Sequence, residues 1–220
     1  MPSFASFSEP GFWLIIALAA AIVLLVARYY VPAPWRAWLA PAYWLFIPYF
    51  ALLAGAVSPR LMGLFWIDWR TTFQVGAGLL LTIGLLAVPA WLFVLPRDET
   101  GRGASGSQRV LWIGLAGAEE WFWCFLRAAL WEIALAAPQT RVAPLYLAVW
   151  GAALLALPLV LALQESGRLR LVKTAILVVT TVVFLFTRNF WLCWLIHASL
   201  AVLFTPAAVR VQRGAVSSLT

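Results

Sequence analysis

The stretch VLWIGLAGAEEWFWCFLRAALWEIALAA, residues 110–137, decides the fold of this chain. It is apolar and long enough for a transmembrane helix, which needs about 20 residues. It nevertheless carries the ionisable side chains of Glu119, Glu120, Arg127 and Glu132. An ionisable side chain at the bilayer centre costs about 2.5–3.5 kcal/mol on insertion scales and usually faces the interior of a bundle. Glu119, Glu120 and Arg127 are therefore the first candidates for a functional site. Glu132, by contrast, lies close to the outer end of the span and is expected to reach the interface in a structural role.

The composition of the chain excludes a soluble protein. Of the 220 residues, 65% are hydrophobic and 10% are charged, whereas soluble domains have about 45–50% and about 25%. The mean hydropathy is +0.95, so we expect a single membrane domain over residues 1–220. Both cysteines lie in apolar runs, and a disulfide framework is therefore not expected. His197 is the single histidine, which excludes sites built from several imidazoles.

The hydropathy pattern predicts an all-α, polytopic transmembrane helix bundle with about seven spans. The expected spans are residues 11–27, 38–57, 75–95, 110–137, 143–163, 171–187 and 190–206. The last two runs are short and close together, so whether both cross the membrane stays open. Residues 1–95 hold the N-terminal spans. Within them, the aromatic segment near 60–74 is predicted to be a helix on the membrane surface.

Basic residues in the connecting segments predict the orientation. If the chain crosses the membrane seven times, four Lys and Arg residues lie on one side and ten lie on the other. The positive-inside rule then places the N-terminus outside and the C-terminus in the cytoplasm. Because the net charge of +7 lies mostly in these loops, it indicates contact with membrane lipids and no nucleic acid. We expect a multi-pass protein of a bacterial cytoplasmic membrane.

Ionisable residues of two spans are predicted to lie at similar depth. At about 1.5 Å per residue, Glu119 and Glu120 lie about 14–15 Å from the cytoplasmic end, near the middle of a core about 30 Å thick. His197 lies about 10 Å from the outer end of the last span, which runs in the opposite direction. We expect the carboxylates and the imidazole to meet. Arg127 is two turns from Glu120, so a direct bridge between them is not expected.

Two segments resemble motifs of the CPBP (ABI) family of intramembrane glutamic-type proteases, which includes the type II CAAX prenyl endopeptidases. The first family motif is Glu-Glu-x-x-x-Arg, and here Glu119-Glu120 is followed by Cys124 at the Arg position. The last motif is a short turn and then a helix with His-x-x-x-Asn. The stretch TRNFWLCWLIHA, residues 187–198, keeps the turn, the aromatic residue and His197 in that order. The resemblance covers about residues 105–205.

The resemblance implies that Glu119 is a general base, Glu120 its structural partner and His197 a donor to the oxyanion, with Arg127 in support. It also implies a membrane-anchored or prenylated protein as substrate, and no metal or cofactor. Three family residues are missing: the first-motif Arg, the last-motif Asn, which is Ala201 here, and a His in the fifth span. Loss of a catalytic member costs several orders of magnitude in rate. The sequence therefore predicts a divergent or catalytically impaired relative.

Three other functions stay open at this point. The first is an active but divergent CAAX-type endopeptidase. The second is a non-catalytic subunit of a pigment- or haem-containing membrane complex, with His197 as the ligand and other subunits as partners. The third is transport, with Glu119 and Glu120 as proton or cation sites. A zinc site is not expected, because catalytic zinc has three protein ligands and the chain lacks a HExxH-type spacing.

Reporter fusions test the predicted orientation. An enzyme reporter that is active only in the cytoplasm, fused after residue 103, is expected to be active, and the same reporter fused after residue 140 is expected to be inactive. A reporter active only outside should give the reverse pattern. Equal activity at both positions would contradict the seven-span arrangement.

Overall fold

The computed structural model describes residues 7–94, 106–137, 143–164 and 166–217, and these residues form seven α-helices and no strand. The helices are α1 (Pro10–Tyr30), α2 (Ala33–Leu53), α3 (Trp69–Val94), α4 (Gly106–Ala136), α5 (Pro144–Leu163), α6 (Gly167–Thr187) and α7 (Phe190–Ser217). The prediction of an all-α chain is confirmed for this part of the protein. Each predicted span corresponds to one helix, with bounds that differ by several residues at some ends.

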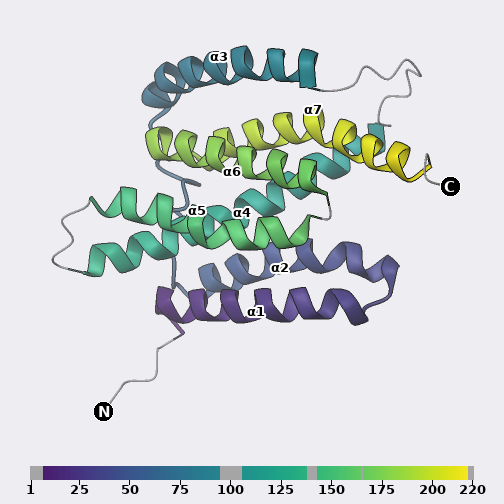
Figure 1. The fold of residues 1–220 in the computed structure, drawn as a ribbon. Coiled ribbons are helices and arrows are strands. Elements are labelled where there is room, and N and C mark those ends of the chain that lie inside the picture. The colour runs from purple at the N-terminus through teal and green to yellow at the C-terminus, as the bar shows by residue number, and fades with distance from the viewer. Residues whose placement is uncertain (1–6, 95–105, 138–142, 165, 218–220) are drawn as a thin grey trace.

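The helices lie side by side, and successive helices run in opposite directions (Figure 1). Helix α4 is central, because it packs against α1, α2, α5 and α7. Helices α1 and α2 form one edge of the bundle, and α3 forms the other edge against α6 and α7 (Figure 1). This order places the ionisable stretch of α4 where neighbouring helices can surround it.

Among the residues that the structure describes, three helices are long and apolar enough to cross a membrane: α1, α5 and α6. The apolar part of α7 that the structure describes, Phe190–Phe204, is shorter. Many large apolar side chains lie on the outside of the bundle, among them Ile15 (66% exposed), Leu154 (68%) and Leu171 (72%). So many exposed large apolar side chains are unusual for a soluble monomer. The chain therefore has the helices and the surface of a membrane protein.

The helix predicted near 60–74 begins later than expected, so the bounds of this prediction are wrong. Residues 59–64 form turns, and a helix begins only at Trp69, the first residue of α3. Asp68 explains this start, because its carboxylate accepts hydrogen bonds from the backbone N–H (3.1 Å) and the hydroxyl (2.6 Å) of Thr71. A carboxylate at this position caps free N–H groups of a first helical turn. The Thr71 hydroxyl and N–H also lower the pKa of Asp68.

The two last helices are joined by a tight corner. Arg188 has a left-handed backbone conformation (φ 47°) and ends α6. The side-chain oxygen of Asn189 then accepts hydrogen bonds from the N–H groups of Trp191 (2.9 Å) and Leu192 (3.2 Å), which caps the start of α7. The corner is therefore encoded locally, and α7 returns along α6.

The turns after α2 are fixed to this corner through Gly63. Its carbonyl oxygen accepts a hydrogen bond from the Phe190 N–H (3.0 Å), and its φ is +77°. A Cβ at this position would lie 2.6 Å from the carbonyl oxygen of Arg188 and 3.0 Å from the Phe190 nitrogen. Because both are backbone atoms, they cannot move aside as a flexible side chain would. Only glycine fits this close approach.

Gly63→Ala is expected to destabilise the protein by at least about 2–3 kcal/mol, because left-handed strain and a backbone overlap add together. Gly55→Ala is the matched control: Gly55 also has a positive φ (+70°), but nothing lies within 4 Å of the added Cβ. Strain alone predicts a loss of about 1–2 kcal/mol there. Thermal unfolding of the two purified variants in the same detergent measures the difference. Equal losses of stability would contradict the packing described for Gly63.

Candidate functional site

The structure brings together the residues singled out in the sequence. Glu119, Glu120 and Arg127 on α4 and His197 on α7 are all at most 1% exposed. The Nδ1 atom of His197 lies 3.2 Å from Oε2 of Glu120, and its Nε2 atom lies 3.4 Å from Oε2 of Glu119. Helices α4 and α7 thus place two carboxylates around one imidazole, inside the bundle.

Arg127 forms a direct ion pair with Glu120, with 2.7 Å between Nη1 and Oε1. The expectation that two turns would prevent this bridge is therefore wrong. The residues lie on one face of α4, separated by about 10 Å along its axis, but helical side chains point toward the N-terminus. The long Arg127 side chain reaches back over this distance. Its Nη2 also donates to the hydroxyl of Thr180 on α6 (3.3 Å), and its guanidinium lies over the Phe184 ring.

Glu119 has a partner that the sequence analysis missed. The ammonium group of Lys173, on α6, donates a hydrogen bond to Oε2 of Glu119 and forms an ion pair with it. Lys173 falls within the predicted span 171–187; it lies in the second turn of α6 and is only 13% exposed. It is the single lysine of the chain, and it directly follows Leu171 and Val172 at the start of a predicted span. These two features of the sequence could have identified Lys173 as a candidate site residue.

The cluster of Glu119, Glu120, Arg127, Lys173 and His197 balances its own charge. Two carboxylates face one guanidinium and one ammonium. A neutral imidazole therefore leaves the cluster without net charge. When Nδ1 carries the proton of this neutral imidazole, it donates to Oε2 of Glu120, 3.2 Å away. Buried charges are tolerated when they are paired in this way. Each carboxylate of the cluster is thus paired with a basic side chain inside the bundle.

The imidazole of His197 has little freedom. Its ring stacks on the indole of Trp123, with 4.8 Å between centroids and 15° between planes. Its Nε2 lies near Glu119 but makes no hydrogen bond with any described residue. One face of the ring and the Nδ1 atom are therefore occupied by α4, and Nε2 is directed at a carboxylate oxygen.

Glu132 lies away from the cluster, whereas Cys124 is in contact with it: its thiol donates to Oε1 of Glu120 (3.8 Å) and accepts from Nη1 of Arg127 (3.5 Å). Glu132 lines a surface cavity of about 500 Å³ at the opposite end of α4 from Gly106, together with Trp131 and Arg188. Cys124 and Cys193 are both buried and unpaired by any disulfide. Among the described residues, no group of three His, Cys, Asp or Glu side chains has the arrangement needed to hold a metal ion.

The chain was compared with protein-family models, with curated proteins and with solved structures, and none of the three comparisons gives a match. The resemblance to CPBP proteases thus rests on the motif residues alone.

Arg127→Met is expected to destabilise the protein by about 3–5 kcal/mol, because it leaves the Glu120 carboxylate buried without its cation. Adding Glu120→Gln should recover part of this loss, since the uncompensated charge is removed as well. Unfolding of the two variants in detergent measures the coupling.

Arg109→Met is the matched control, because Arg109 is an exposed arginine of the same helix. Its stability is expected to change by no more than about 0.5 kcal/mol. A loss at Arg127 no larger than the loss at Arg109 would show that the ion pair does not hold the bundle together.

Proposed function

We propose that this chain is a CPBP-like integral membrane protein of about seven spans that lacks peptidase activity and acts by binding other components of the membrane. The single observation that carries this proposal is the pairing of Glu119 with Lys173 inside the bundle. The residue that would serve as the general base is already neutralised by a cation, and only 1% of its side chain is exposed.

A general base must lie within hydrogen-bond reach of the proton that it removes, directly or through one water. Oε2 of Glu119 is approached by Lys173 on one side and by Nε2 of His197 on the other. An ammonium ion in contact with a carboxylate stabilises the ionised carboxylate. The carboxylate therefore accepts a proton less readily. The arrangement therefore favours a fixed ion pair over an activated water.

The other parts of a hydrolytic site are also absent from their expected positions. The fifth helix, α5, has no histidine, and Tyr146 near its start is 50% exposed. On α7, the position four residues after His197 holds the buried Ala201, which has no side-chain donor. The Nδ1 atom of His197 faces Glu120 and so is not directed at a substrate oxyanion. An oxyanion needs donors aimed at the place where charge develops.

A haem or pigment ligand is a weaker alternative. An axial histidine directs one nitrogen at the metal and commonly donates the other N–H to a second group. In this bundle both nitrogens of His197 lie next to carboxylates, and Trp123 stacks on the ring. No described contact of His197 favours a bound cofactor.

The seven-span arrangement is supported by exposed aromatic residues at opposite ends of the bundle. Tyr29 and Trp35 lie where α1 and α2 meet and are 85% and 70% exposed. Phe65 and Trp66 lie in the turns before α3 and are 64% and 87% exposed. Aromatic side chains gather at both membrane interfaces in this way. Helices that connect the two ends then cross the apolar layer, and the larger number of basic residues in the loops on one side supports a cytoplasmic C-terminus.

A cleavage assay tests the loss of peptidase activity. The purified protein, reconstituted in lipid, is incubated with farnesylated and geranylgeranylated CAAX peptides, and the products are read by mass spectrometry. We expect the wild-type protein and Glu119→Gln to give the same background, because the Glu119 carboxylate is held by Lys173.

Glu132→Gln is the matched control, since it removes an acid from the same helix outside the cluster. Cleavage by the wild-type protein and by Glu132→Gln, but not by Glu119→Gln, would establish a working protease and overturn the proposal.

A further inference from the structure

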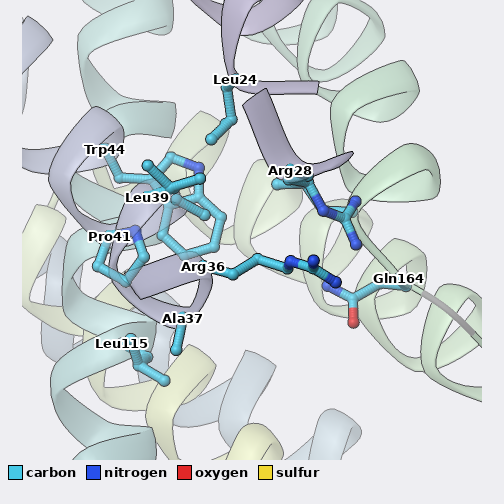
Figure 2. Close-up of a pocket in the computed structure, with 11 residues that line it drawn as sticks. Leu24, Arg28, Arg36, Ala37, Leu39, Pro41, Trp44, Leu115 and Gln164 are labelled. Carbon is cyan, nitrogen blue, oxygen red and sulfur yellow. The ribbon is translucent and has the colours of Figure 1, made fainter. Parts of the chain in front are cut away.

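A second surface cavity, of about 370 Å³, opens at the end of the bundle where α1 meets α2 and α5 meets α6 (Figure 2). Its wall comes from the end of α1, the first half of α2, Leu115 of α4 and the end of α5. None of the residues of the buried charge cluster lines it. It is therefore separate from the site described above.

One side of this cavity is cationic. Arg28 and Arg36 extend their guanidinium groups toward the same side, next to the amide of Gln164 (Figure 2). Each is held by a backbone carbonyl at a helix end: Arg28 donates to Ala162 (2.9 Å) and Arg36 to Val31 (3.2 Å). A guanidinium has five N–H donors in a planar fork that matches phosphate. The two held arginines thus present further donors at one place.

The other side of the cavity is apolar. Leu24, Leu39 and Trp44 lie together on the side away from Gln164 (Figure 2). Leu24 and Trp44 are only 5% and 8% exposed, so these side chains are packed against the rest of the bundle. A cavity with arginines at one side and an aliphatic and aromatic wall at the other matches a molecule with an anionic group next to a hydrocarbon chain.

The surroundings place this cavity at the depth of lipid head groups. Tyr29, Tyr30, Trp35 and Trp38 belong to the same helix ends and are 62–85% exposed. Exposed tyrosine and tryptophan side chains of a membrane protein sit at the boundary between hydrocarbon and head groups. Basic pockets between transmembrane helices at this level are known to bind phosphorylated lipid head groups.

We propose that this cavity, the Arg28–Arg36 site, binds an anionic phospholipid, with the phosphate between the two guanidinium groups and an acyl chain along Leu39 and Trp44. Charge complementarity distinguishes it from the cavity at the other end of the bundle. There Arg60 and Arg188 are accompanied by Asp68 and Glu132, whereas the lining of the Arg28–Arg36 site has two arginines and no acid. This inference does not depend on whether the charge cluster is catalytic.

Lipid binding by the purified full-length protein tests the site. The protein in detergent is titrated with phosphatidylglycerol, phosphatidylcholine or free glycerol 3-phosphate, and bound species are counted by native mass spectrometry. We expect phosphatidylglycerol to bind about tenfold or more tightly than the other two, because only it supplies both a net negative charge and acyl chains. Equal binding of phosphatidylcholine, or of the free phosphate, would overturn the assignment.

Two sets of variants locate the binding. The double substitution Arg28→Gln and Arg36→Gln should weaken phosphatidylglycerol binding about tenfold or more. The matched control, Arg109→Gln and Arg168→Gln, removes the same charge from exposed arginines that do not line the cavity, and should change binding less than about twofold. Equal effects of both pairs would show that net charge alone attracts the lipid.

Ala40→Phe tests the apolar half without a change of charge, since Ala40 also lines the cavity. It should weaken phosphatidylglycerol binding while the unfolding temperature without lipid stays within a few degrees of wild type. Undiminished binding by a folded Ala40→Phe protein would place the lipid elsewhere and contradict the proposal.

Discussion

The pairing of Glu119 with Lys173 and of Glu120 with Arg127 permits the rest of the bundle to form. Removing an ion from water costs several kcal/mol even after relaxation, and the cost is recovered only if partners and hydrogen bonds are close. Here each carboxylate has its own cation, and the imidazole of His197 lies between the carboxylates. Because the partners come from α4, α6 and α7, the charges also specify which helices must meet. Most other contacts of α4 are apolar and less selective.

The same pairing limits the chemistry of the cluster. A carboxylate that acts as a base needs an accessible lone pair and a nearby water, and Glu119 offers its Oε2 atom to Lys173 instead. The residues that resemble a protease motif form internal electrostatic contacts in this bundle. The Glu119–Lys173 pair joins α4 to α6, and the contacts of His197 with both carboxylates join α4 to α7. The surface features at the two ends of the bundle, including the Arg28–Arg36 site, are independent of this cluster and remain available for binding.

Much of the fold could be predicted from the sequence, because long apolar runs fix helices in a membrane protein. The meeting of Glu119, Glu120 and His197 also followed from counting residues along two antiparallel spans. The partners of the carboxylates did not follow. The reach of Arg127 depends on side-chain direction, which spacing along a helix does not express, and Lys173 lies on a third helix whose rotation the hydropathy pattern leaves open. The start of α3 at Trp69 depends on the capping contact of Asp68 with Thr71. The aromatic residues of the segment near 60–74 had instead suggested a helix that starts earlier.

The charge state of Glu119 tests this account most directly. Infrared difference spectra between the wild-type protein and Glu119→Gln, recorded in lipid nanodiscs at neutral pH, report whether the carboxyl group is ionised. We predict a carboxylate band in the wild-type protein, and its replacement by a protonated C=O band in Lys173→Met, because the stabilising cation is then lost. A protonated C=O band in the wild-type protein that shifts in D₂O would contradict the account. It would mean that Glu119 is neutral, exchanges with water and is free for proton transfer.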